Sequence, residues 1–331
     1  MPLARRKVLA MGAAGVTAAF APRSAHAAGN GRVLVSGLGF PEGPVALQDG
    51  GLLFVDIARG TLNRASPDGR IAMVAETGGG PNGAAIGPDG AAYVANDGGL
   101  AFRTIDGRTL VSGVPPEYVG GSIQRVDLGT GAVRTIYDGL GEHRLKGPND
   151  IVFDEWGGFW FTDTGKFYGR TRDHGGLYWG IPDGSQLREI AYPLLTPNGI
   201  ALGPDRRTLY VALSDKRQIV ACTLIGPGQV KMADGRPVMR VVASLGGDFS
   251  IDNIAVEANG NLVLAAVRMG AILTVNQRGE IIETVRLPDP VVTAMAFGGE
   301  DMKTLFVTLS STGRIMALPW PRAGQPAVYR A

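Results

Sequence analysis

The chain is poor in the residues that most often carry covalent or nucleophilic chemistry. It has one cysteine, Cys222, among 331 residues, so no disulfide can form within the chain. Three histidines are present, and none forms a recognisable nucleophile–base pattern with Cys222. We therefore expect Cys222, in the apolar run Ile219–Cys222, to be a buried strand residue rather than a reactive thiol.

The sequence also lacks helical periodicity and long apolar runs. No useful stretch repeats apolar residues every three or four positions, and outside the N-terminal segment no run is long enough to span a bilayer. Short apolar runs bounded by glycine, proline, aspartate and asparagine dominate instead, with 50 glycines and 21 prolines in the chain. This pattern predicts many short strands joined by tight turns.

Residues 1–27 are expected to be an export signal that is cleaved. Arg5-Arg6-Lys7 precedes an apolar segment, and Ala25-His26-Ala27 is a typical cleavage site. The arginine pair resembles a twin-arginine signal, which predicts a periplasmic protein. The mature domain is then expected over 28–331.

The balance of charge excludes one class of partner. The expected signal holds four basic and no acidic residues, which leaves 28 Lys and Arg against 30 Asp and Glu in the remainder. Nucleic-acid binding needs a basic face, so none is expected. We also expect no membrane association after removal of the signal, and a monomer or weak oligomer.

One short phrase recurs six times at intervals of 40 to 67 residues. Each copy is followed by an apolar segment, a polar or glycine-containing turn and a second apolar segment. The copies begin at Pro41-Glu42-Gly43-Pro44, Pro81-Asn82-Gly83, Pro148-Asn149-Asp150, Pro197-Asn198-Gly199, Ile251-Asp252-Asn253 and Val292-Thr293-Ala294. Such a period is typical of repeat architectures.

The repeat predicts an all-β, six-bladed propeller with four-stranded antiparallel blades. The first unit contains four strand signals within about 33 residues, which is one blade. The sixth unit has no clear fourth strand, so we expect the N-terminal strand Arg32–Ser36 to close it through Val33 and Val35. An insertion at 99–121 in the second unit is expected to be a long loop on one face.

The variable second position of the phrase predicts a metal site. The inner strand of each blade lines the axis, so these positions should converge at one end. Glu42, Asn149, Asn198 and Asp252 offer carboxylate and amide oxygens, which suit Ca²⁺, Mg²⁺ or Mn²⁺. Asn82 and Thr293 are expected to complete the ring without holding the metal.

These motifs resemble the senescence marker protein/gluconolactonase/luciferin-regenerating-enzyme family of six-bladed propellers. The residues that carry the likeness are Glu42-Gly43-Pro44 with Leu53–Asp56, Gly147–Asp150 with Phe161–Asp163, Pro197–Leu202 with Leu209–Ala212, and Asp252-Asn253. The likeness covers nearly all of the chain after residue 27.

The resemblance implies a set of roles. One divalent ion, Ca²⁺ first and Zn²⁺, Mn²⁺ or Mg²⁺ otherwise, would be held by Glu42, Asn198 and Asp252, with Asn149 binding metal or substrate. Asp252 is the candidate general base. The residues expected to contact substrate are Asn149, Asp150, Lys146, Asn253 and Asn82.

The chain departs from the family pattern at two places. Family lactonases that act on sugar acids often carry an arginine just before the third-phrase asparagine, where this chain has His143–Pro148, so Lys146 or Arg144 would serve instead. The fifth phrase reads Ile251-Asp252-Asn253 rather than Pro-Asp-Gly. Both departures bear on sugar specificity more than on metal binding.

The resulting interpretation is a metal-dependent hydrolase that opens small, sugar-type lactones by attack of water. The substrate is expected to be a small lactone or ester. The alternatives on the same fold are an organophosphate esterase, a strictosidine-synthase-like enzyme, and a non-catalytic, calcium-stabilised binding protein. Fold alone does not choose among them.

Overall fold

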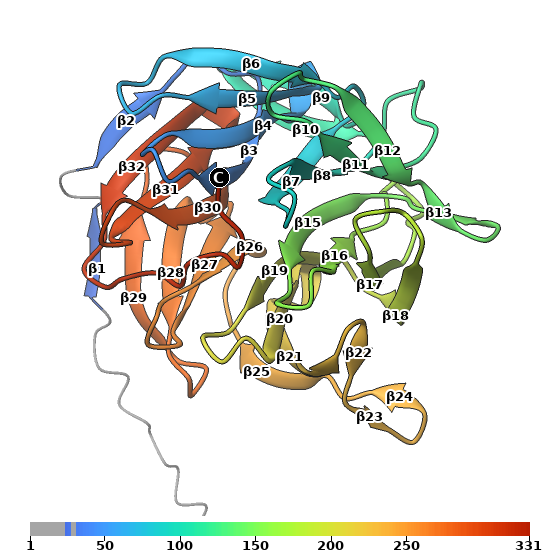
Figure 1. Ribbon diagram of the computed structural model, residues 1–331. Coiled ribbons are helices and arrows are strands. Elements are labelled where there is room, and N and C mark those ends of the chain that lie inside the picture. The colour runs from blue at the N-terminus through green and yellow to red at the C-terminus, as the bar shows by residue number, and fades with distance from the viewer. Residues whose placement is uncertain (1–23, 28–30) are drawn as a thin grey trace, which may run out of the picture.

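The computed structural model describes residues 24–27 and 31–331. Its strands form small antiparallel sheets arranged around a central axis, as Figure 1 shows, which confirms the predicted six-bladed propeller. Within the described residues, no helix is long and apolar enough to cross a membrane.

Within each of the first three blades, the strands follow one another in chain order from the axis outward. Blade 1 contains β3 (Pro41–Ala46), β4 (Leu52–Asp56), β5 (Thr61–Ala65) and β6 (Ile71–Glu76). Blade 2 contains β7 (Pro81–Ile86), β8 (Ala92–Asn96), β11 (Ser122–Val126) and β12 (Val133–Tyr137). Blade 3 contains β15 (Pro148–Phe153), β16 (Phe159–Asp163), β17 (Gly175–Gly180) and β18 (Leu187–Leu194).

The last three blades follow the same order. Blade 4 contains β19 (Pro197–Leu202), β20 (Thr208–Leu213), β21 (Gln218–Gly226) and β25 (Arg240–Ser244). Blade 5 contains β26 (Ser250–Val256), β27 (Leu262–Val267), β28 (Ala271–Val275) and β29 (Ile281–Arg286). Blade 6 contains β30 (Val292–Gly298), β31 (Thr304–Leu309), β32 (Arg314–Pro319) and, on its outer edge, β2 (Arg32–Val35).

Short strands and 3-10 helices lie in the connections between the main strands. The additional strands are β13 (Gly139–Leu140), β14 (His143–Arg144), β22 (Gln229–Val230), β23 (Met232–Ala233) and β24 (Arg236–Pro237). The 3-10 helices are η1 (Ile57–Arg59), η2 (Ser214–Lys216) and η3 (Ser310–Thr312). Each 3-10 helix follows the second strand of its blade and returns the chain into the third.

The two ends of the chain close the ring as predicted. Val33 pairs with Met316 and Val35 with Ile315, so β2 supplies the fourth strand that the sixth unit lacks. This pairing hydrogen-bonds segments about 280 residues apart, and it removes two open sheet edges.

The segment expected to be an export signal lies mostly outside the described residues. Its last four residues, Ser24–Ala27, form β1, which pairs in parallel with β29 at the outer edge of blade 5. Cleavage and export to the periplasm stay predictions.

The core lies between neighbouring blades, because each sheet buries apolar side chains on both faces. One cluster joins Ala212 and Ile219 of blade 4 to Leu264 and Leu273 of blade 5. Cys222 is buried in β21, as predicted, and burial raises the pKa of its thiol to about 11.

Blade 3 contains a buried polar anchor. Asp154, which is fully buried, accepts hydrogen bonds from the indole nitrogens of Trp160 at 2.9 Å and Trp179 at 3.0 Å. Its other oxygen accepts from the backbone N–H of Trp156 at 2.9 Å. These tryptophans therefore pack the blade rather than form a platform for substrate.

The insertion in the second unit is more ordered than predicted. It forms a hairpin of β9 (Ala101–Ile105) and β10 (Arg108–Gly113) in place of a simple long loop. Phe102 of the hairpin packs on Phe40, with ring centroids 5.2 Å apart, so the hairpin is fastened to blade 1 as well as to blade 2. A two-stranded hairpin satisfies backbone groups that an open loop would expose.

Candidate functional site

Every inner strand is irregular at the repeated phrase. The register of pairing with the second strand shifts within or just after each copy, between Glu42 and Val45, Pro81 and Gly83, Pro148 and Ile151, Pro197 and Ile200, Ile251 and Ile254, and Val292 and Met295. A bulge inserts an extra residue and re-aims the side chains beside it. The phrase therefore turns its polar residues toward the axis in all six blades.

The glycine of the phrase lets neighbouring inner strands approach closely. Gly43 has φ +50°, and a Cβ there would lie 2.4 Å from the carbonyl oxygen of Asn82 in the next blade. A Cβ on Gly199 would lie 2.6 Å from the carbonyl oxygen of Asp252. Any side chain at these positions would push apart the strands that carry the polar ring.

Two carboxyl groups meet at this ring. Glu42 is buried, and its pKa is raised well above the ordinary value, first by burial and then by the nearby charge of Asp252. A 2.6 Å hydrogen bond from the Gly43 N–H acts in the opposite direction. Burial raises the pKa of Asp252 to about 7, although a hydrogen bond from Asn198 opposes the shift. Two buried carboxylates this close repel each other, and a cation between them would remove the repulsion.

The amide of Asn198 favours the same conclusion. Its nitrogen faces Asp252, while its Oδ1 is buried and has no hydrogen-bond partner. A buried acceptor without a partner is uncommon in proteins and calls for an explanation, of which a site for an ion is one. The set of Glu42, Asn149, Asn198 and Asp252 thus fits a hard divalent cation.

This donor set depends on amides as well as carboxylates. Within 24–27 and 31–331, no three His, Cys, Asp or Glu side chains cluster so as to hold a metal by themselves. Asn149 and Asn198 would have to supply the remaining oxygens. Thr293 is already engaged, because its hydroxyl hydrogen-bonds Thr308 at 2.8 Å and Ser310 at 2.5 Å. Its hydroxyl is therefore held within blade 6, and the expectation that it does not hold the metal stays a prediction.

A cavity of about 850 Å³ opens above the ring. Its walls include all the second-position residues of the middle blades, namely Asn82, Asn149, Asn198 and Asp252. Ser214 and Ser250 add hydroxyls beside Asp252. A volume of this size accommodates a ligand larger than a monosaccharide lactone.

A buried ion pair forms one wall of this cavity. Lys166 is 5 % exposed, and its Nζ lies 3.2 Å from Oδ1 of Asp97 and donates to the carbonyl oxygen of Gly99 at 2.8 Å. Asn82 donates to the other oxygen of Asp97 at 3.4 Å. The ring of Tyr118 lies 5.2 Å from the ammonium group. This network joins the loop after β16 to the start of the blade 2 insertion.

Asp150 and Asn253 were expected to contact substrate, and the structure places them elsewhere. Oδ2 of Asp150 accepts from the Ile200 N–H at 3.0 Å and from Asn253 Nδ2 at 2.8 Å. Asn253 Oδ1 in turn accepts from the Met295 N–H at 3.2 Å. Burial raises the pKa of Asp150 to about 6. These hydrogen bonds therefore link the inner strands of blades 3, 4, 5 and 6 in one layer.

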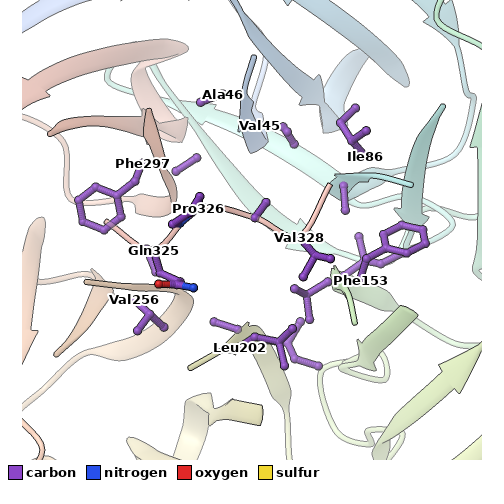
Figure 2. Close-up of a pocket in the computed structure, with 18 of the residues that line it drawn as sticks. Val45, Ala46, Ile86, Phe153, Leu202, Val256, Phe297, Gln325, Pro326 and Val328 are labelled. Carbon is purple, nitrogen blue, oxygen red and sulfur yellow. The ribbon is translucent and has the colours of Figure 1, made fainter. Parts of the chain in front are cut away.

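Both residues line a second cavity of about 180 Å³ on the other side of the ring. Figure 2 shows its apolar walls, which include Val45, Ile86, Phe153 and Leu202 from different blades. The C-terminal segment 325–330 also lines this cavity, and Figure 2 shows it running between those walls. Asp150 and Asn253 follow the ring residues by one position, so they occupy the neighbouring layer and not the wall of the large cavity. Their contact with substrate stays a prediction.

Lys146 is also not where the sequence suggested. It is exposed and is not among the residues that line the large cavity. Its backbone forms two hydrogen bonds: the N–H donates to Asp163 at 2.7 Å, and the carbonyl accepts from the Tyr118 hydroxyl at 2.6 Å. Asp163 caps this turn and also accepts from the Gly147 and Gly165 N–H groups.

Sequence reasoning missed Lys166 and the hairpin residues of the cavity wall. Lys166 lies in the loop between β16 and β17, and its burial depends on a distant partner, Asp97. Arg103 and Val111 reach the cavity from the β9–β10 hairpin. A lysine in a glycine-rich loop gives no sequence signal that it is buried.

The fold and the polar ring define a propeller with one oxygen-lined site on its axis. The profile of the SMP-30/Gluconolactonase/LRE-like region matches residues 40–311. The chain belongs to this family.

Sequence relatives carry lactonase names. The chain is 29% identical over 207 residues to the gluconolactonase of Zymomonas mobilis, a match that covers 56% of this chain and 51% of the relative. It is 27% identical over 195 residues to the 6-deoxy-6-sulfogluconolactonase of Pseudomonas putida, covering 56% and 65%. The chain thus spans about half to two thirds of the length of these curated relatives.

Solved structures share the fold. A calcium-binding protein, regucalcin, from Agrobacterium tumefaciens superposes with a TM-score of 0.70 at 18% identity, covering 90% of this chain and 96% of that one. A gluconolactonase from Xanthomonas campestris superposes with a TM-score of 0.68 at 22% identity, covering 89% and 91%.

Proposed function

We propose that the protein hydrolyses lactones and that it uses one divalent metal ion, Ca²⁺ first, at the axial ring. The observation that carries the proposal is the ring itself, in which the buried carboxyl group of Glu42, the half-buried one of Asp252 and the unpartnered Oδ1 of Asn198 come together at one end of the axis. Family membership and the lactonase names of the relatives support the reaction class.

Glu42, Asn149, Asn198 and Asp252 would hold the ion. When bound, a divalent ion supplies a positive charge that polarises the lactone carbonyl and stabilises the oxyanion formed there. Ser250, whose hydroxyl oxygen accepts from Arg268 at 2.9 Å, keeps its O–H to donate to the ring oxygen or a substituent of the lactone. Ser214 donates its O–H to the Ile251 carbonyl and can only accept from a substituent.

Asp252 would act as the general base and then as the general acid. Its carboxylate accepts a proton from the water whose oxygen attacks the carbonyl carbon, and the bond between that carbon and the ring oxygen then breaks. The departing alkoxide takes the proton back, which yields a hydroxy acid and restores Asp252.

The test combines metal analysis with a panel of substrates. Protein treated with chelator should lose lactone turnover by at least about 100-fold and regain it when Ca²⁺, Zn²⁺ or Mn²⁺ is added back. Asp252→Asn keeps an oxygen in place but removes the charge and the base, so kcat should fall by about 10²–10⁴. Asp183→Asn, at an exposed blade 3 turn away from the cavity, is the matched control.

Two results would overturn the proposal. Full turnover after exhaustive metal removal would end the metal-dependent mechanism. Absence of hydrolysis across sugar, alkyl and aryl lactones in metal-loaded protein would leave the binding protein as the better description, and turnover of a phosphotriester alone would favour the esterase.

A further inference from the structure

The large cavity changes character between its floor and its rim. The floor is the polar ring around Asp252. The rim, in contrast, is built by the β9–β10 hairpin and by the loop between β16 and β17. From these two segments and the residues beside them the cavity takes five apolar side chains, Leu100, Val111, Val114, Phe167 and Tyr168, and five polar ones, Arg103, Ser112, Thr164, Lys166 and Arg172.

Several of these rim side chains are left exposed. Phe167 is 57 % exposed, Tyr168 46 % and Val111 45 %. Exposed apolar groups that gather around a cavity, rather than scatter singly, are typical of a binding surface. Covering them would release water from apolar area, which favours binding by about 25 cal/mol for each Å² covered.

The rim is held in place before any ligand arrives. Phe102 fastens the hairpin to Phe40 of blade 1, and the buried Lys166 donates to the carbonyl of Gly99 at the base of the hairpin. On the other side, Lys166 directly precedes Phe167 in the chain, so the same anchor fixes the loop that carries Phe167. A preformed apolar wall loses little conformational entropy on binding.

Two of the three cationic side chains at the rim are paired. Lys166 forms an ion pair with Asp97, and Arg172 is engaged by Asp215 at 2.5 Å. Arg103 is exposed on the hairpin. The exposed rings of Phe167 and Tyr168 present carbon surface to a group that extends beyond the floor, and a polyhydroxylated sugar would find no polar partner on that surface.

We propose that the substrate is a lactone with an apolar alkyl or aryl substituent, whose ring lies at the polar floor and whose substituent covers Phe167 and Val111. This inference rests on the proposed function for its lactone ring. The substituent must extend from the floor to the rim, so short lactones and sugar lactones leave the rim uncovered.

The experiment measures kcat/KM on the metal-loaded protein for γ-lactones of increasing alkyl chain, from γ-butyrolactone to γ-undecalactone, with glucono-1,5-lactone alongside. Each methylene that reaches the rim should raise kcat/KM by about fourfold, followed by a plateau. Phe167→Ser should lower kcat/KM for the long-chain lactones by about tenfold and change γ-butyrolactone by less than about twofold. Ile225→Ser replaces an equally exposed apolar residue of β21 outside the cavity and should change neither.

Binding of 2-alkylcyclopentanones, which lack the scissile bond, separates this inference from the proposed reaction. If no lactone is hydrolysed but affinity still rises with chain length and falls in Phe167→Ser, the apolar rim is supported and the reaction is not. Affinity and kcat/KM that are independent of chain length would overturn the inference. So would a preference for glucono-1,5-lactone, or a salt-sensitive preference for an anionic lactone that Arg103→Gln removes.

Discussion

Replacing Glu42 by glutamine should stabilise the metal-free protein and abolish its stabilisation by metal. Glu42 is buried and Asp252 half-buried beside it, and neither carboxyl group has a cationic side chain as a partner among its main interactions. Without a cation, holding both as carboxylates opposes folding. The glutamine amide of the Glu42→Gln variant keeps an oxygen for the Gly43 N–H and adds an N–H that can face Asp252.

The magnitude follows from Glu42 itself, whose pKa is raised well above its ordinary value by burial and then by the charge of Asp252. Keeping one carboxylate buried without a cation costs several kcal/mol. Relaxation and hydration reduce such effects, so we expect Glu42→Gln to raise the unfolding free energy of metal-free protein at pH 7.5 by about 1–3 kcal/mol.

The dependence on pH has a defined sign. A carboxyl with a raised folded-state pKa favours folding below its ordinary pKa, and this contribution is lost as pH rises through the folded-state value. Metal-free wild-type protein should therefore lose stability between about pH 4 and 7. Saturating metal should reverse the loss, by about 2.7 kcal/mol at 100 times the dissociation constant.

Urea unfolding at pH 5 and pH 7.5, with chelator and with excess Ca²⁺, measures all of these effects. Glu76→Gln, an exposed carboxylate on the outer strand of the same blade, is the control and should behave like wild type. A Glu42→Gln protein that is less stable than wild type without metal would refute the electrostatic reasoning. One that is still fully stabilised by Ca²⁺ would remove Glu42 from the metal site.

Three further predictions concern the framework. Asp154→Ala leaves the indole N–H groups of Trp160 and Trp179 without a partner and should lower the unfolding free energy by about 3–5 kcal/mol; a loss below about 1 kcal/mol in urea would contradict this. Cys222, with a thiol pKa of about 11, should react with a thiol reagent at pH 8 at least about 100-fold more slowly than in guanidinium, and equal rates would contradict its burial. Tyr329→Ala, at the opposite end of the axis from the site, should lower stability by about 1–3 kcal/mol and leave kcat/KM unchanged; a matching loss of activity would show that the tail acts on the site.

The six copies of the repeated phrase were enough to predict the propeller architecture, because each copy is a local sequence signal. Proline, glycine and flanking apolar runs specify a bulged inner strand whatever the rest of the chain does. Six copies therefore indicated the number of blades. The missing strand of the sixth unit and the spare strand Arg32–Val35 indicated the closure of the ring.

The sequence did not predict which layer along the axis each of two neighbouring polar side chains occupies. Asn149 and Asp150 are both polar and adjacent, yet one lines the large cavity and the other hydrogen-bonds Asn253 across the second layer. A strand alternates its faces at each residue, and the bulge resets that alternation, so the layer of each side chain depends on the exact position of the bulge.

The sequence by itself determined the all-β fold and the six blades, and it predicted the ring of Glu42, Asn149, Asn198 and Asp252, because repetition converts weak local signals into a strong one. The tertiary structure alone decided the rest of the site. The burial of Lys166 against Asp97 and the apolar rim of the β9–β10 hairpin involve partners from different blades. Such contacts arise only when the ring closes and brings distant segments together, so no local pattern records them.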